Sequence, residues 1–272
     1  MNGPDLLAAN ASILRTRVGA CWPGERAVFR GHDLHADLHG IDWMALYVFG
    51  ITGRHFGPEQ IRLLHGIWTL TSYPDSRLWN NRVAAIAANT RSSSVLGLAA
   101  GIAITEAGVY GGRPGIRAID FFLRAGTAVS AGGEIGEFVA RELASRRIYG
   151  YGRPINCIDE RLPPLIKLVE SLGFEQGQHY RLAFKVEKIL VGEYKPFLKM
   201  NFAALTAALA ADLGFTPRQY HLFNILKTLA GIPPCILEAA EKPAGALFPT
   251  RCNDIDYRGQ APRPWTGSTE NT

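Results

Sequence analysis

The sequence predicts an all-α fold. Apolar residues recur at helical spacing along the chain, candidate helix caps stand between these recurrences, and alternating strand patterns are scarce. Of the 272 residues, 47% are hydrophobic and 19% are charged, which is typical of a globular protein and excludes a disordered chain. This length favours one large domain with a smaller lobe.

The segment 95–104, VLGLAAGIAI, follows three serines. It is apolar on every side, which predicts a helix that is buried all round. Its small residues permit close contacts between helices. A place in the core of the protein is the simpler interpretation, and a place in a dimer interface is the alternative.

Four later segments carry apolar residues three and four positions apart, which predicts helices with one buried face. They lie around residues 116–123, 135–143, 165–172 and 222–229.

The last of these helices has a clear start. Thr216 is placed as its N-cap, Pro217 as its first helical residue, and Gln219 closes a capping box. Gly214 is placed to end the helix before it.

Two glycine-rich stretches, 126–133 and 150–154, predict turns at which lobes can meet. We therefore place a small helical lobe at 151–235 and a large helical domain at 1–150 and 236–272.

The formal net charge of +5 favours an anionic partner, but the basic residues are spread along the chain instead of forming blocks. This distribution argues against nucleic acid and fits a small anionic ligand.

The four cysteines lie far apart, and with the histidines they show no ligand spacing for a metal. Reduced thiols in the cytoplasm are the simplest interpretation. The N-terminus lacks the pattern of a secretion signal, and we expect no membrane-spanning segment.

Several short motifs resemble, in order, those of citrate synthases and citryl-CoA lyases, two groups of the citrate synthase superfamily. Residues 29–33 (FRGHD) resemble the family's "YRGYD", 46–54 (LYVFGITGR) its "LYLLLTGRLP", and 110–112 (YGG) its "HGG". Farther along, 148–161 resemble "PGFGHPVY" and "DPR", 199–202 (KMNF) "NVDFY", 229–238 (LAGIPPCILE) "VAGWIAHALE", and 257–260 (YRGQ) "YVGP". The resemblance covers roughly 28–263 and implies an all-α, citrate synthase-like fold with a large helical domain and a smaller lobe.

The resemblance also implies a chemistry, in which an acyl-CoA α-carbon is deprotonated and joined to a keto acid, or the reverse. In the family a carboxylate takes the α-proton, and two histidines hydrogen-bond the oxygens on which charge develops. These three catalytic positions fall at Asn201, Tyr110 and Arg153. An amide cannot abstract a proton, whereas a phenol and a guanidinium can still donate hydrogen bonds.

The substrate-binding positions are altered as well. Arg161 and Arg251 remain as candidate clamps for carboxylates. The arginine that the resemblance places before "VAG" falls at Thr228, with Lys227 beside it.

The backbone N–H groups of Gly111 and Gly112, at a predicted helix start, are a candidate cradle for an oxyanion or phosphate. Pro233 and Pro234 interrupt a segment that is helical in the family, so we expect this wall of the pocket to be reshaped.

The sequence thus predicts a divergent protein that acts on an acyl-CoA or a related organic acid. Carbon–carbon bond formation, bond cleavage and related enol chemistry, without the usual general base, are the reactions in question. A non-catalytic ligand-binding protein or scaffold of the same fold is the alternative. We expect a homodimer, no permanently bound cofactor, and coenzyme A thioesters as possible substrates.

Overall fold

The computed structural model describes residues 2–12, 14–108, 111–153, 158–247 and 251–264, without the side chain of Cys252. The N-terminal half contains α1 (Gly3–Asn10), β1 (Gly19–Trp22), β2 (Arg26–Phe29), β3 (His32–Asp33), α2 (Trp43–Thr52), α3 (Pro58–Thr69), α4 (Trp79–Asn89), α5 (Ser94–Ile104) and α6 (Arg113–Ser130). It is followed by α7 (Ile135–Ser145), α8 (Leu162–Ser171), α9 (Gln178–Ile189), η1 (Leu190–Tyr194), α10 (Phe202–Asp212), α11 (Pro217–Ile225), η2 (Leu229–Gly231), α12 (Ile232–Glu241) and η3 (Cys252–Asp254).

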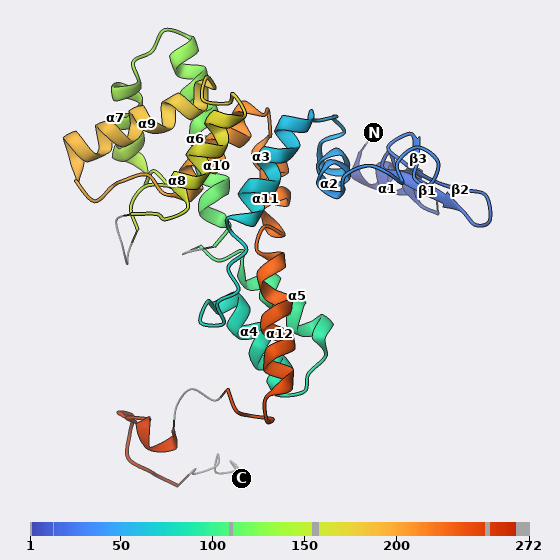
Figure 1. Ribbon diagram of the computed structural model, residues 1–272, viewed down its shortest axis with the longest axis vertical. Coiled ribbons are helices and arrows are strands. Elements are labelled where there is room, and N and C mark those ends of the chain that lie inside the picture. Colours follow the sequence, from blue (N-terminus) through green and yellow to red (C-terminus); the bar gives the residue numbers. More distant parts are fainter. Residues whose placement is uncertain (1, 13, 109–110, 154–157, 248–250, 265–272) are drawn as a thin grey trace.

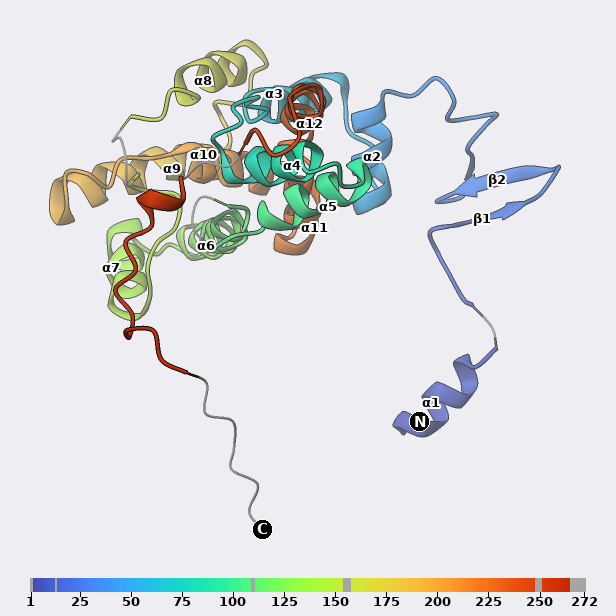
Figure 2. The same cartoon turned by 90° about the horizontal axis from the view of Figure 1, so that it is seen from below.

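The predicted all-α class is confirmed, because helices dominate and the one small sheet lies outside the helical body (Figure 1). That sheet has the antiparallel order β1-β2-β3, and its register pairs Gly19 with Phe29 and Val28 with Asp33. We did not expect these short strands. Figure 2 shows that α1 and the sheet extend away from the helices, and α1 buries none of its residues.

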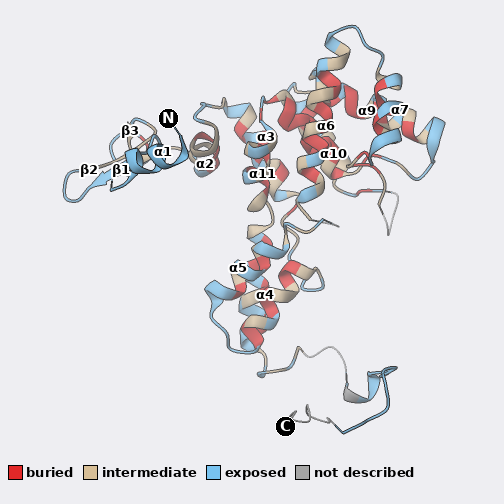
Figure 3. Ribbon diagram, turned by 180° about the vertical axis from the view of Figure 1, so that it is seen from behind, coloured by how far each residue is buried: buried red, intermediate tan, exposed pale blue. Residues whose placement is uncertain are grey.

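The main core lies where α6, α9 and α10 pack together with α3, α8 and α11 (Figure 3). Nearly every residue of α10 is buried, because this helix is apolar on all sides and runs through the centre of the bundle. The helices predicted around 116–123, 135–143 and 165–172 are α6, α7 and α8. The division into two lobes stays a prediction.

A second, smaller core joins α4, α5 and α12 below the main bundle (Figure 1). Here the expectation that 95–104 is buried on every side is wrong within this chain. Gly97 and Gly101 face α4, where added side chains would meet Ala87 and the backbone of Asn80. The opposite face is open, and Val95 and Leu96 are 75% and 65% exposed.

The start of α11 is as predicted. The side chain of Thr216 accepts a hydrogen bond from Gln219 N, and the Gln219 side chain accepts one from Thr216 N, at 3.3 and 3.0 Å. Gly214 follows the end of α10 with a φ of +74°, which glycine adopts without strain. The helix is shorter than predicted, because it ends at Ile225.

Residues 217–241 are long and apolar enough to span a membrane by length and composition alone, which the sequence reading did not anticipate. The stretch is divided, however, into α11, η2 and α12, and it buries Tyr220, Phe223 and Ile232 inside the protein. The core helices of globular proteins pass the same test. Pro233 and Pro234 stand in the first turn of α12, where their missing N–H groups cost little.

Candidate active site

The site is built around the junction between the loop at 150–153 and the start of α10. Gly152 N donates to Lys199 O at 2.7 Å, and Asn201 N donates to Gly150 O at 2.9 Å. Gly150 has a φ of +96°, and a Cβ there would lie 2.6 to 2.8 Å from atoms of Ala204. Only glycine permits this approach, so the loop is fixed against the helix.

Asn201 holds this junction with both atoms of its amide. Its Oδ1 accepts from Ala203 N at 2.9 Å and caps α10, while its Nδ2 donates to Gly152 O at 3.0 Å. The residue at the predicted position of the general base is therefore occupied in structural hydrogen bonds. An aspartate could make the first bond but not the second.

Asp159 and Arg161 form a buried ion pair beside Asn201. Two parallel hydrogen bonds of 2.8 Å join the Arg161 guanidinium to the Asp159 carboxylate, whose side chain is fully buried. Asp159 also accepts from Phe202 N at 2.9 Å. Burial alone would raise the pKa of Asp159, but Arg161 and the Phe202 N–H lower it below the usual 3.8.

The guanidinium of Arg161 lies over the ring of Phe202, with its central carbon 4.6 Å from the ring centroid. Its Nε and Nη2 are used by Asp159. Its Nη1 makes no hydrogen bond within the described part of the chain, so two donors remain for a ligand.

Arg153 pairs with Glu160 on the more exposed side of the cluster. Its Nη1 donates to Glu160 Oε2 at 2.8 Å and to Ile158 O at 2.6 Å. The Tyr73 hydroxyl donates to Glu160 Oε1 at 2.8 Å. A backbone N–H bond and these two partners lower the pKa of Glu160 to about 2, and burial together with Glu160 raises the pKa of Tyr73 to about 12. Neither group exchanges protons readily near neutral pH.

Lys227 is the cation of the cluster that has no ion-pair partner among the described residues. It is partly buried just beyond α11, and its backbone oxygen accepts from Thr71 Oγ1 at 3.1 Å. Burial and the neighbouring charge of Arg161 lower the pKa of its ammonium from 10.5 to about 8. At neutral pH the site thus holds an uncompensated positive charge.

The charges of the cluster do not balance. Asp159 and Glu160 are each committed to an arginine, and Lys227 is left over. A partly buried cation without a counter-ion is costly, and an anionic ligand lowers that cost. The arrangement suits a carboxylate held between Lys227 and the free Nη1 of Arg161.

The other predicted site residues have different placements. Tyr110 lies outside the described residues. Gly111 sits so close to Ala107 and Thr105 that a Cβ would lie 2.3 to 2.7 Å from their backbone atoms, and Gly112 N donates to Thr105 O. That second N–H is therefore used and is not free for an oxyanion.

Thr228 directly precedes η2, beside Lys227. Arg251 lies in the C-terminal segment 251–264, which Figure 1 shows below α12 and away from the helical bundle that contains α8. The structure therefore does not bring Arg251 to the cluster within one chain.

Sequence reasoning missed Tyr73 as a site residue, because nothing near it in sequence marks it. It also missed the part of Asp159 as the partner of Arg161, although the two residues stand in the segment that resembles "DPR".

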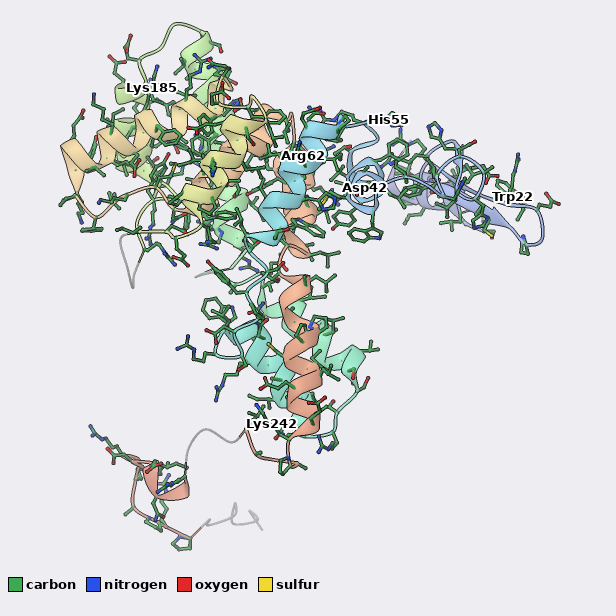
Figure 4. The ribbon with its side chains drawn as sticks, in the orientation of Figure 1. Trp22, Asp42, His55, Arg62, Lys185 and Lys242 are labelled. Carbon is green, nitrogen blue, oxygen red and sulfur yellow. The ribbon has the colours of Figure 1, made fainter. Side chains whose placement is uncertain are left out.

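A cavity of about 420 Å³ lies away from the cluster of Arg161 and Lys227, between the sheet and α2. Its lining is almost entirely apolar and contains none of the predicted site residues, so we do not place the chemistry there. Figure 4 shows Asp42 and His55 near this region. The carboxylate oxygen Oδ1 of Asp42 lies at hydrogen-bond distance, 3.0 Å, from Nε2 of His65. No group of three potential metal ligands occurs among the described residues.

Comparison with solved structures finds the same architecture in citryl-CoA lyase from Hydrogenobacter thermophilus, with a TM-score of 0.81, 21% identity, and coverage of 93% of this chain and 97% of that chain. A mutant of ATP citrate lyase from Methanosaeta concilii, in complex with (3S)-citryl-CoA, gives 0.74 at 17% identity over 96% of this chain and 45% of that chain. Citrate synthase from Thermoplasma acidophilum, with carboxymethyl coenzyme A and oxaloacetate, gives 0.63 at 17% identity over 84% and 59%. No family model and no curated protein sequence matches the chain.

Proposed function

We propose that this protein, whose chain has the fold of the citrate synthase superfamily, binds an organic acid at the cluster of Arg161 and Lys227. The observation that carries the proposal is the unbalanced charge of Lys227 beside a guanidinium with two free donors. A carboxylate between them would accept hydrogen bonds from both cations and neutralise the surplus charge. The solved structures of the same fold with citryl-CoA or oxaloacetate support an acid of this kind.

We further propose that the protein acts on such an acid or on its coenzyme A thioester, by forming or cleaving a carbon–carbon bond or by related enol chemistry. Tyr110 and Arg153 would donate hydrogen bonds to the oxygens on which charge develops. Asn201 would take no proton, because a carboxamide is not a base and both of its polar atoms already hold the loop. The usual deprotonation would therefore be lost, at a cost of about 10²- to 10⁴-fold in rate.

A non-catalytic binding protein is the second candidate, and one observation favours it. Nη1 of Arg153 is committed to Glu160 and to the backbone, and Asn201 is committed to the loop. Two of the three altered positions thus hold the structure together. In this reading the cluster would recognise the acid without transforming it.

We also propose that the protein is a homodimer. The open face of α5 exposes Val95 and Leu96, and Leu237 of α12 is 64% exposed nearby in the same three-helix unit. Side chains of this size and exposure on adjacent helices are typical of an interface. A cytoplasmic location stays a prediction.

The binding proposal is tested by thermal shift and calorimetry with citrate, oxaloacetate, coenzyme A and acetyl-CoA. At about a hundredfold excess over Kd, a ligand should raise the melting temperature by about 5 to 10 °C. Lys227→Met should weaken acid binding at least about tenfold, as expected when a charged hydrogen bond is lost. Lys185→Met is the matched control, because Lys185 is exposed on α9 in the upper bundle (Figure 4).

Failure of every acid to bind, or equal binding by Lys227→Met, would contradict the proposal. Turnover separates the two candidate functions. Products detected by mass spectrometry after incubation with an acyl-CoA and a keto acid support the enzyme, and tight binding of the acid without any product supports the binding protein.

A further inference from the structure

A second cavity lies apart from the cluster of Arg161 and Lys227, where the end of α5 and the turn before α6 meet α11. Its volume is about 90 Å³. None of Arg153, Arg161 and Lys227 lines it. Its lining consists of Ile102, Ala103, Thr105, Glu106, Gly112, His221, Asn224 and Ile225.

Asn224 is the unusual member of this lining. The residue is only 4% exposed, and neither its Oδ1 nor its Nδ2 has a hydrogen-bond partner among the described residues. An unsatisfied buried amide costs free energy, so it calls for a partner outside the protein.

Tyr220, the candidate partner within the fold, does not satisfy the amide of Asn224. Thr206 donates to Phe202 O at 2.8 Å, so the hydroxyl of Tyr220 must give its own proton to Thr206 Oγ1 at 2.9 Å. The phenol therefore has no proton left for Asn224 Oδ1. The Asn224 Nδ2 group lies near Tyr220 but does not meet hydrogen-bond geometry with it.

The amide also has little freedom to turn elsewhere. A Cβ on Gly115 of α6 would lie 3.2 Å from Asn224 Nδ2 and 3.3 Å from the ring of Tyr220. Helix α6 thus packs directly against the amide, and a side chain larger than glycine would crowd this contact. The crowding leaves the cavity as the open side of Asn224.

The charges around the cavity disfavour an ion. Glu106 and His221 face each other, with 3.2 Å between Oε1 and Nε2, so the acid and the base on the lining are already paired. A carboxylate ligand would find no free cation here and would present only acceptors to Asn224 Oδ1. A neutral group that both donates and accepts suits the site better.

We propose that Asn224 binds a planar, neutral group with an adjacent donor and acceptor, of which a primary carboxamide is the simplest. Such a group gives an N–H to Oδ1 and takes an N–H from Nδ2 in two parallel bonds, as Asn does with the edge of adenine. The volume of about 90 Å³ equals the share of about three water molecules in the liquid, which admits a group of this size. The proposal is independent of acid binding at Lys227.

The test uses acetamide as the probe, with acetate and N-methylacetamide as controls. Acetate lacks a donor, and a trans secondary amide cannot present its N–H and C=O side by side. Acetamide should raise the melting temperature of the intact protein, and the two controls should not. An equal effect of acetate, or no effect of acetamide, overturns the proposal.

The variant Asn224→Leu keeps the shape of the side chain and removes both polar atoms. If the amide serves a ligand, this change should abolish the acetamide effect and raise the melting temperature of the free protein by about 2 to 4 °C, because an unsatisfied buried group is removed. A lower melting temperature, with no acetamide effect in the unaltered protein, would mean that ordered water satisfies Asn224 and would overturn the proposal.

A high-resolution crystal structure of the unaltered protein with acetamide decides the matter if Asn224→Leu does not fold. The proposal requires the amide in the cavity with both contacts to Asn224 at about 2.7 to 3.2 Å. Water alone in the cavity refutes it.

Discussion

Changing Asn201 to aspartate restores a carboxylate at the position where the resemblance places the family's general base. The new side chain can still accept from Ala203 N and cap α10, as Asn201 does at 2.9 Å. It cannot donate to Gly152 O, which lies 3.0 Å from the present Nδ2. Two acceptors would then face each other at the junction that carries the site.

The magnitude follows from these two contacts. Leaving the partly buried carbonyl of Gly152 without its donor costs about 1 to 3 kcal/mol. A negative charge at the N-terminus of α10 stabilises the folded protein by about 0.3 to 1 kcal/mol. We therefore expect Asn201→Asp to lower the free energy of unfolding by about 1 to 2 kcal/mol at neutral pH. In acid the protonated carboxyl can donate to Gly152 O, so the loss should shrink.

Urea unfolding followed by tryptophan fluorescence measures this difference at neutral and acidic pH. Asn201→Ala is the control, because it removes both bonds and should destabilise the protein more than aspartate does, with no dependence on protonation. If Asn201→Asp were as stable as the unaltered protein at neutral pH, Asn201 would not hold the loop and our account of its role would be wrong.

Three further predictions concern the cluster and the open helix face. Because burial lowers the pKa of Lys227 from 10.5 to about 8, the unfolded chain binds more protons between these values, so stability should rise with pH across that window and Lys227→Met should flatten the rise in melting temperature. Arg161→Met removes the bidentate partner of the buried Asp159 carboxylate, which keeps only Arg153 Nη1 at 4.0 Å, and should lower the free energy of unfolding by about 3 to 5 kcal/mol in urea titrations; an unchanged midpoint would contradict the pairing. Val95→Glu with Leu96→Glu should convert a dimer to monomers in sedimentation velocity, whereas an equal charge change on the exposed face of α9 should not; a monomeric unaltered protein would refute the interface.

The sequence predicted best what depends on local chemistry. The capping box of Thr216 and Gln219 and the helix end at Gly214 follow from neighbouring residues alone, and both are confirmed. The resemblance to the citrate synthase superfamily rests on the order of motifs over roughly 28–263, and the likeness to solved structures confirms it for the fold.

What the sequence could not predict depends on contacts between distant residues. Tyr73 hydrogen-bonds Glu160 from a loop 87 positions away in the sequence. That Lys227 has no ion-pair partner among the described residues becomes evident only when the structure shows Asp159 paired with Arg161. The burial of 95–104 was misjudged for a related reason. An apolar helix sequence indicates that all faces of the helix are buried, but it does not indicate whether they pack against the same chain or against a second copy.

The most direct test of acid binding at Lys227 is calorimetric titration with citrate near pH 8.5, in two buffers of different ionisation enthalpy. In the free protein Lys227, with a pKa of about 8, is largely neutral there, and a bound carboxylate should recharge it. We predict that binding takes up between about half a proton and one proton, and that Lys227→Met takes up none. Citrate that does not bind, or that binds with the same proton uptake in the variant, would contradict the account.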